Sequence, residues 1–453
     1  MLKNKKISVL DLIALAVGSI IGWGAFILPG DLFLTKIGFL NSIIGLFIGG
    51  IIIIIIERNY SYLIKKIPFS GGEFLFTKKV LGKKNSFVCG WFLSLAYICI
   101  IPLNATAIAL IFNILTKNKY TYIYLYKIGS YQVYASDIII TSIFIIFLGY
   151  LNIKGVKIAS YFQKIMVLLL VTIVLFFFIK IIMEDGVITS NLISHISEVE
   201  LKIDNIFKIV VICPWAYVGF DCVTQILEEL NMKNTTISKI SICSLFIGWL
   251  LYSLILLFTA YGISYQELMN GNINWATGET IERYFGAMGI YLLAIALIAA
   301  VVCGVNGFYL NASKLIAAMS KERQLPKFLN KKNKDGLPIN SILSVMMFSL
   351  LAPWLGREVL LWIVDMSSLG IAIAYFYVSV ITIKLYYQEN KKIKITGVIG
   401  GFASILFIIL LVFPILESSL KTESIYILIL WTIIGILYYL YKFKKIEEKD
   451  ICF

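Results

Sequence analysis

Charged residues are scarce in this chain. They make up 15% of its 453 residues, whereas hydrophobic residues make up 60%. An average soluble domain carries about 25% charged residues, so this composition excludes an ordinary soluble protein. The sequence predicts an integral membrane protein whose main solvent is the lipid bilayer.

Histidine and paired cysteines are also scarce, which argues against metal and redox chemistry. The chain has one histidine, His195, in a polar stretch that we expect to be a loop, and its seven cysteines form no CxxC pair. Tetrahedral metal sites need clustered thiolates or imidazoles, so we expect no metal and no cofactor. The acidic residues are scattered, which argues against an intramembrane enzyme. No pore-loop repeat is present, which argues against a channel.

Long apolar runs account for most of the chain. A helix needs about 20 apolar residues to cross a bilayer, and twelve runs are candidates. The predicted spans are 10–31, 37–56, 86–115, 136–153, 158–183, 206–227, 238–263, 286–318, 339–355, 359–387, 396–416 and 422–443. Only short polar stretches separate them, so we expect residues 1–453 to form a single transmembrane domain with both termini on the same side.

The positive charge of +14 is unevenly distributed. Most lysines and arginines fall at the two termini and in every second loop, including the stretches 57–85 and 319–338. Positive loops remain in the cytoplasm, so the sequence predicts a multi-pass protein of the cell membrane with both termini cytoplasmic. The charge then serves orientation and attraction to anionic membrane lipid, and we expect no nucleic-acid partner.

Helix-weakening residues gather in the first span, which reads "GSIIGWGAFILPG" over residues 18–30. Glycine at Gly18-xxx-Gly22, as at Gly45-xxx-Gly49, is typical of close helix packing, and spacing alone leaves packing and a functional break equally open. The density of glycine before Pro29 favours a break. The sixth span, "CPWAYVGFD" at 213–221, is interrupted in the corresponding place, and paired breaks point to a substrate site near the bilayer midplane.

A broken helix offers free peptide groups at membrane depth, where they must line a cavity or be buried in protein. Helix N-termini attract carboxylates, and free carbonyl oxygens accept hydrogen bonds from an ammonium group. No charged side chain lies in the first break. The pattern therefore indicates a zwitterion such as an α-amino acid.

Four stretches carry a resemblance to a known family. "GSIIGWGAFILPG" resembles the first-helix motif of the amino acid–polyamine–organocation (APC) superfamily, and "IPFSGGEFLFTKKVLG" (67–82) resembles that superfamily's P-x-S-G-G-E loop. "PWAYVGFDCVTQILEEL" (214–230) is similar to its sixth helix. "NASKLIAAMSKERQLPKFLNKKNKDGLPINSI" (311–342) is similar to its eighth helix and the loop that follows. The motifs occur in the family's order along nearly the whole chain.

The resemblance implies an all-α membrane fold of the leucine-transporter type. Twelve helices would form two inverted repeats of five, at 10–183 and 206–387, with helices one and six broken and two peripheral helices at 396–443. It also implies transport of an amino acid or related amine by alternating access. A receptor that senses an amino acid without moving it, on the same fold, is the alternative.

The resemblance also implies roles for particular residues. Carried over by position, the substrate carboxylate would meet the backbone N–H groups of Gly22, Trp23 and Gly24. Its ammonium group would meet carbonyl groups of the two breaks. The residues expected to line the site are Ile20, Gly22, Trp23, Gly24, Trp215, Tyr217, Val218 and Asp221, with Trp215 and Tyr217 as aromatic gate or pocket residues.

Two positions depart from the family pattern. Trp23 stands where a small serine or threonine is common, and Leu170 stands where several sodium-independent members carry a lysine in the fifth helix. The coupling ion, a proton or sodium, therefore stays open, as do the substrate's side chain and the direction of transport.

Several further polar residues lie within or near the predicted spans, and each has a structural or a functional interpretation. Asp221 either titrates, contacts a cationic substrate or accepts a structural hydrogen bond, and Asp365 is similar. We expect Asp11 to be a helix N-cap and Glu228 and Glu229 to contact cytoplasmic lysines. Interhelical hydrogen bonding competes with substrate or ion contact at Asn104, Asn306 and Asn311, and Ser313 is a candidate ion ligand.

Overall fold

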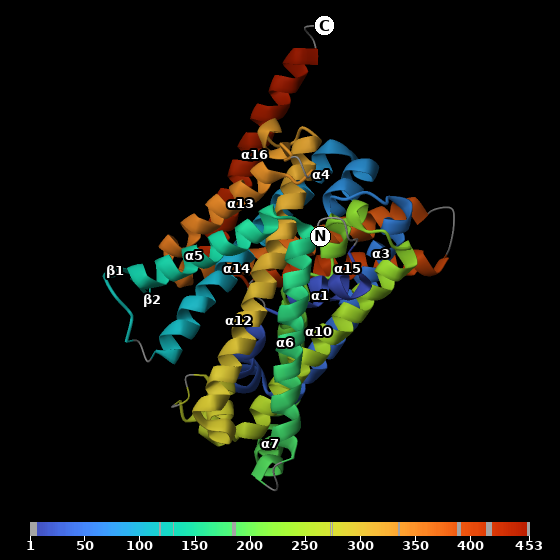
Figure 1. Ribbon diagram of the computed structural model, residues 1–453. Helices are drawn as coiled ribbons and strands as arrows, with labels where there is room; N and C mark the ends of the chain where they lie inside the picture. Colours follow the sequence, from blue (N-terminus) through green and yellow to red (C-terminus); the bar gives the residue numbers. More distant parts are fainter. Residues whose placement is uncertain are drawn as a thin grey trace.

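The fold is nearly all helical (Figure 1). The computed structural model describes residues 7–116, 119–129, 131–183, 187–271, 273, 275–333, 336–386, 391–413 and 419–450. The end of the predicted span 396–416 and the terminal lysines at positions 3, 5 and 6 lie outside these residues.

Long helices alternate with short helical pieces along the chain. In the first half they are α1 (Val9–Ile20), α2 (Gly24–Leu28), the π-helical η2 (Pro29–Ile37), α3 (Phe39–Lys66), α4 (Gly72–Leu115), α5 (Ala135–Ile153), α6 (Val156–Ile182) and α7 (Val187–Ser197). In the second half they are α8 (Ile203–Ala216), α9 (Cys222–Gln225), η3 (Leu227–Glu229), α10 (Asn234–Gly262), α11 (Tyr265–Met269), α12 (Ala276–Lys321), η4 (Lys327–Asn330), α13 (Ile339–Leu351), η5 (Ala352–Leu355), α14 (Gly356–Tyr386), α15 (Lys391–Val412) and α16 (Thr422–Asp450).

Ten helices in the described part of the chain are long and apolar enough to cross a membrane. Helix α1 and the segment Gly24–Ile37 meet at a bend of 48° and make eleven if they are one span. The predicted span 206–227 is missing from this set because α8 has 14 residues and ends at Ala216. The count of twelve spans therefore stays a prediction.

Several polar stretches are more ordered than the sequence suggests. Helix α3 continues to Lys66, and α4 begins at Gly72 and turns at Gly82, where φ is 84°. A hairpin of β1 (Tyr124–Ile128) and β2 (Tyr131–Tyr134) joins α4 to α5 in an antiparallel pair. A search for long apolar runs misses these elements, because polar and apolar residues alternate irregularly in them.

Two local predictions need correction. Ser8, and not Asp11, is the N-cap of α1, and Asp11 completes a capping box as the third helical residue. The Asp11 carboxylate also forms an ion pair with Lys164, at 2.6 Å. His195 lies in helix α7 rather than in a loop, and it is 1% exposed.

Small residues allow close helix contacts, as their spacing predicts. A Cβ atom added to Gly45 would lie 2.5 Å from Ile209 Cβ, and one added to Gly49 would lie 2.1 Å from Cys213 Sγ. Both neighbours belong to α8, so the packing role of this glycine pair is confirmed. Helix α1 lies at the centre, where it packs against α6, α10 and α12.

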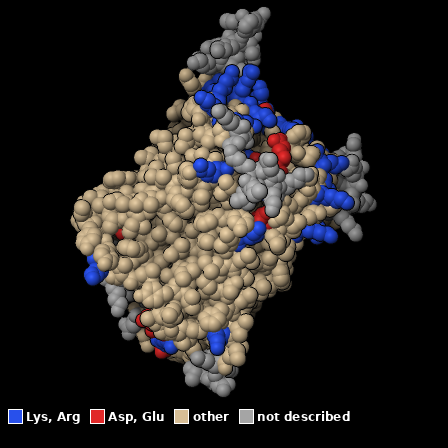
Figure 2. Space-filling model, viewed as in Figure 1, with Lys and Arg blue, Asp and Glu red and all other residues tan. Residues whose placement is uncertain are grey.

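The two ends of the molecule differ in charge. In Figure 2, Lys and Arg side chains gather in the upper part of the view, and a broad surface without charge separates them from the few charges at the lower end. The lower end is formed by α7, α11 and the first part of α12, from Ala276 to the bend at Gly286 (Figure 1). We call this group of helices the cap.

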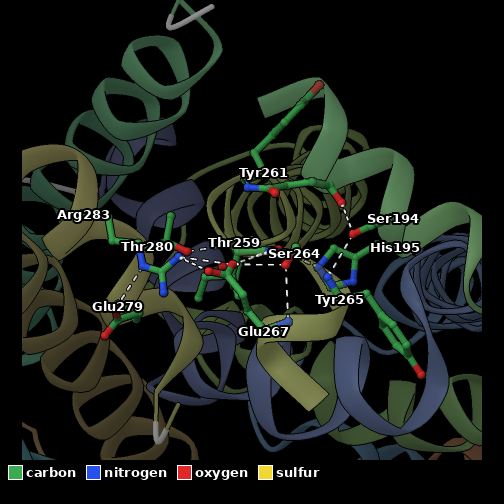
Figure 3. Close-up of polar contacts among 12 residues, drawn as sticks. Ser194, His195, Thr259, Tyr261, Ser264, Tyr265, Glu267, Glu279, Thr280 and Arg283 are labelled. Atoms are coloured by element: carbon green, nitrogen blue, oxygen red, sulfur yellow. Dashed lines mark hydrogen bonds and ion pairs between the residues drawn. The ribbon is translucent and has the colours of Figure 1, made fainter. Parts of the chain in front are cut away.

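Polar contacts hold the cap together (Figure 3). The Tyr265 N–H donates to Ser194 Oγ at 2.9 Å, and the Arg283 guanidinium bridges Glu267 and Glu279. His195 Nε2 donates to the Ile263 carbonyl oxygen at 2.9 Å, while its Nδ1 atom has no partner in the described part of the chain. Burial lowers the pKa of His195 from its ordinary 6.5, and the hydrogen bond to Ile263 opposes this shift.

The buried imidazole predicts a pH dependence of stability. Because the folded-state pKa is lowered, the unfolded chain takes up the proton first as the pH falls. The stabilisation by neutral His195 is complete above about pH 6.5 and is lost as the pH falls through the folded-state pKa. Between about pH 7.5 and 5, the unfolding temperature of the purified protein should fall by roughly 1–3 °C more than that of His195→Gln. Identical pH profiles would contradict this assignment.

Candidate functional site

The first helix is interrupted between Ile20 and Gly24. The chain is extended at Ile21, with ψ 106°, and α2 restarts at Gly24. The N–H groups of Gly22 and Gly24 have no acceptor among the described residues, as expected beside a helix N-terminus. The Trp23 N–H faces Asn104 Oδ1 at a long 3.4 Å. The break therefore presents peptide donors with little internal pairing.

A second interruption separates α8 from α9 and spans residues 217–221. Pro214 lies in the last turn of α8, and Gly219 adopts φ +123°, a conformation that favours glycine. A Cβ atom at Gly219 would lie 2.6 Å from the backbone carbon of Ser19 and 2.8 Å from Ile20 N. The second interruption therefore touches the last turn of α1, directly before the first interruption, and only glycine fits at the contact.

A cavity of about 850 Å³ opens beside these interruptions. Its lining includes Trp23 and Gly24 from the first break, Trp215 from the end of α8, and Leu103 from α4. The lining also includes five charged side chains, those of Asp31, Lys36, Lys208, Asp365 and Lys421. Asp365 accepts a hydrogen bond from Ser424 Oγ at 3.3 Å. The cavity thus combines two tryptophan side chains with charges of both signs.

Three of the eight predicted site residues line this cavity, namely Trp23, Gly24 and Trp215. Gly22 lies behind them, where an added Cβ would be 2.7 Å from Asn104 Oδ1. Ile20 is buried against Gly248 of α10, and Val218 is buried in the core. Tyr217 is also buried and donates from its hydroxyl to the Leu46 carbonyl oxygen at 3.0 Å.

Asp221, the eighth, lies in a buried polar network away from the cavity wall. Its carboxylate accepts from the Gly219 N–H at 2.8 Å and from the Tyr97 hydroxyl. It also exchanges a hydrogen bond with Glu73. Hydrogen bonds tie this carboxyl pair to α3, α4 and the segment after the second break.

Glu73 is a further candidate for the site that the sequence analysis did not single out. It is fully buried at the start of α4 and accepts from Tyr60 Oη at 2.8 Å and from Gln225 Nε2 at 2.9 Å. The P-x-S-G-G-E loop motif contains Glu73 and could have indicated it, but the motif does not predict its contact with Asp221. The pairing depends on the second break, which brings α9 against the start of α4.

Arg357, near the start of α14, was also missed. Its guanidinium carbon lies 4.1 Å from the centroid of the Trp23 ring, and Nη1 donates to Thr106 Oγ1 at 2.8 Å. The residue falls between two apolar runs in the sequence, so no pattern singles it out. Its stacking partner Trp23 is the residue that departs from the family pattern.

The remaining polar candidates have mainly structural contacts. Asn306 Nδ2 donates to Gln163 Oε1 at 2.6 Å, which confirms interhelical hydrogen bonding there. Ser313 donates within its own helix to the Leu310 carbonyl oxygen. The side chain of Asn311 is buried with no partner among the described residues. Position 170 of α6 is a buried leucine, so this helix has no titrating group where several family members carry a lysine.

The lysine-rich end holds the expected acid–lysine contact. Glu229 forms an ion pair with Lys314, which confirms the predicted role of that glutamate. The N–H group of Glu228 donates to Ser70 Oγ at 2.8 Å. Within the described residues, no group of three His, Cys, Asp or Glu side chains is arranged to hold a metal ion.

Comparison with known proteins agrees with this geometry. The chain is 24% identical to a serine/threonine exchanger of Bacillus subtilis over 71% of its own length and 70% of the relative's. It is 23% identical to a branched-chain amino acid permease of the same organism, over 97% and 94% of the two chains. It is 24% identical to a putative amino-acid transporter of Methanocaldococcus jannaschii, over 89% and 97%.

The family assignment follows from the match over almost the whole chain. The model of the amino acid permease family matches residues 7–437. Its relatives include exchangers and permeases, and the apolar helices described above provide the membrane-embedded body. The chain therefore belongs to the amino acid permease family of the APC superfamily, and it is a membrane transporter rather than an enzyme.

Proposed function

We propose that this protein is a secondary active transporter that moves an amino acid or related amine by alternating access, with its substrate bound at the breaks of helices one and six. The observation that carries the proposal is that the second break packs against the end of α1, where the first break begins, beside a cavity of about 850 Å³. Peptide groups at membrane depth are tolerated where they are buried or line such a space.

The zwitterionic head group would be held mainly by backbone. The free N–H groups at Gly22 and Gly24, with Trp23 between them, would bind the carboxylate. Carbonyl groups of Ile20, Trp215 and Val218 would accept from the ammonium group. Trp215 would cover the pocket, since its ring lies over Gly24 at 2.9 Å from the position of a Cβ.

The proposed architecture is twelve spans in the leucine-transporter arrangement. Two inverted repeats of five helices would cover 10–183 and 206–387, and 396–443 would supply the two peripheral helices. The interruption of the first and sixth predicted spans supports this symmetry, because each opens one repeat. The lysine-rich end in Figure 2 would be cytoplasmic and the cap extracellular, in a cell membrane. The cavity then faces outward.

A proton is the coupling ion that the buried network supports best. The Glu73 and Asp221 carboxyl groups contact each other, and their other partners are neutral: Tyr60, Tyr97, Gln225 and the Gly219 N–H. No cation contacts either carboxyl group among the described residues. Two adjacent buried carboxylates repel each other, so a shared proton stabilises the pair. Losing that proton would loosen the link between α4 and α9.

The substrate assignment predicts that bulk at Gly24 blocks transport. Gly24→Val places methyl groups between the peptide donors and the cavity and against Trp215. Uptake of a labelled amino acid into proteoliposomes should fall at least roughly tenfold, which corresponds to about 1.4 kcal/mol. The probe is chosen beforehand by a thermal-shift screen of the common amino acids.

Gly401→Ala serves as the control, because its Cβ meets only Ser379 Cβ at an ordinary 3.7 Å. Unchanged uptake by Gly24→Val would reject the site assignment. Tight binding by the wild-type protein with neither uptake nor exchange would instead indicate an amino acid receptor.

The coupling proposal predicts that Glu73→Gln uncouples uptake from the pH gradient. Exchange of labelled for unlabelled substrate needs no net proton movement and should continue, whereas accumulation driven by an inward proton gradient should be lost. Glu57→Gln is the matched control, since Glu57 is a buried carboxyl group that pairs with Ser61 outside the network. Gradient-driven accumulation that survives in Glu73→Gln, or that requires sodium, would exclude this pair as the coupling site.

A further inference from the structure

A buried arginine, for which no ion pair is found among the described residues, stacks on Trp23 of the proposed site. Arg357 follows Gly356, whose φ of 75° turns the chain into α14, and it is 7% exposed. Its guanidinium lies over the Trp23 ring at 4.1 Å. The first break and the start of α14 therefore bring a permanent positive charge onto the side chain of Trp23, the central residue of the first break.

The hydrogen bonds of Arg357 leave its charge uncompensated. Nη1 donates to Thr106 Oγ1 at 2.8 Å and to the Leu103 carbonyl oxygen at 3.4 Å, and both acceptors are neutral. Nη2 is buried and has no acceptor in the part of the chain that the structure describes. Asp137, which lines a small pocket together with Arg357, accepts a hydrogen bond from Asn113 Nδ2.

A second donor beside the guanidinium is also unpaired. Trp23 Nε1 is buried and has no acceptor among the described residues. Trp23 belongs both to the wall of the 850 Å³ cavity and, with Arg357, to the wall of the wider space under the cap. Two unpaired donors on one stacked pair of side chains need an acceptor, because buried donors without partners are costly.

A carboxylate is the acceptor that fits this pair. A buried charge is stable only when a counter-charge and hydrogen bonds compensate for its lost hydration. Guanidinium groups bind carboxylates in a fork geometry, which gives both strength and direction. The proposed function already brings a carboxylate to this break with each substrate molecule.

We propose that Arg357 is the counter-ion of the substrate's carboxylate and that it makes the transporter select amino acids over their decarboxylated amines. This inference rests on the proposed transport function and settles which of its two substrate classes is preferred. An amine brings a positive charge to Arg357 without neutralising it, so it is disfavoured. The acidic side chains of the wider space under the cap, such as Asp31 and Glu282, favour the ammonium end of a zwitterion on its way in.

The experiment compares matched ligand pairs on the purified full-length protein. The pairs are L-leucine with 3-methylbutylamine and L-serine with ethanolamine, and binding is measured by calorimetry. L-leucinamide, which replaces the carboxylate by a neutral amide, is the third probe. The wild-type protein should bind at least one amino acid roughly 10- to 100-fold more tightly than its amine and its amide.

Arg357→Gln should remove most of that preference, because binding of the amino acid becomes weaker. Arg357→Lys should keep part of the preference, because it retains the positive charge but not the two parallel N–H donors of the guanidinium. Arg283→Gln is the control, since this arginine pairs with Glu267 and Glu279 in the cap. If Arg357→Gln does not fold, the amide and amine ratios of the wild-type protein and of Arg357→Lys still decide the question.

Equal binding of amino acid and amine by the wild-type protein, or an unchanged ratio in Arg357→Gln, would overturn the role of Arg357. In either case, intact amino acid uptake into proteoliposomes would leave the proposed transport function standing. Failure of the wild-type protein to bind or move any amino acid would overturn the proposed function itself.

Discussion

Backbone polarity in a lipid environment is the constraint on which the rest of this structure depends. Inside a bilayer, peptide groups must pair within the protein or line a cavity. Helices α1 and α8 both end partway through the molecule, and the chain beyond α8 packs at Gly219 against Ser19 in the last turn of α1. This contact shields part of the irregular backbone after α8, and the adjoining cavity provides space for a ligand beside the break after α1.

The buried ionisable groups near these segments form two sets of opposite charge. Glu73 and Asp221 are two buried acids that contact no cation among the described residues, and the proposed coupling supplies a proton to them. Arg357 is a buried cation that contacts no acid in the described part of the chain, and the proposed substrate supplies a carboxylate to it. Asp221 directly follows the second break and Arg357 stacks on Trp23 of the first, so the proposed proton and substrate charge would act at different breaks.

The sequence predicted much of the fold because hydrophobicity decides it. Ten of the predicted spans correspond to long apolar helices, and the glycine pair Gly45 and Gly49 packs as its spacing implies. Helix ends in polar stretches could not be placed, because capping decides them: Ser8 rather than Asp11 caps α1. The cap helices and the β1–β2 hairpin were missed for a related reason, since their residues do not form apolar runs.

The candidate site was predictable only in part. Glycine density indicated the interruption after α1, Pro214 and Gly219 indicated the one after α8, and Trp23, Gly24 and Trp215 do line the cavity. Glu73 and Arg357 could not be assigned from one sequence, because both are singled out by long-range contacts. Glu73 contacts Asp221, about 150 positions further along the chain. Arg357 contacts Trp23, more than 300 positions before it. Long-range pairing of buried charges leaves no periodic signal in a single sequence.

One contact of the cap has a mechanical consequence. Trp275 Nε1 donates to the Phe26 carbonyl oxygen at 3.0 Å, and Gly30 lies so close to Ala276 that an added Cβ would be 2.8 Å from its side chain. The segment Gly24–Ile37, formed by α2 and η2, is thus in direct contact with the start of α12 in the cap. If transport proceeds by the proposed alternating access, any tilting of that segment must also move the cap. A nanobody bound to α11 and the first part of α12 would then stop transport without entering the cavity.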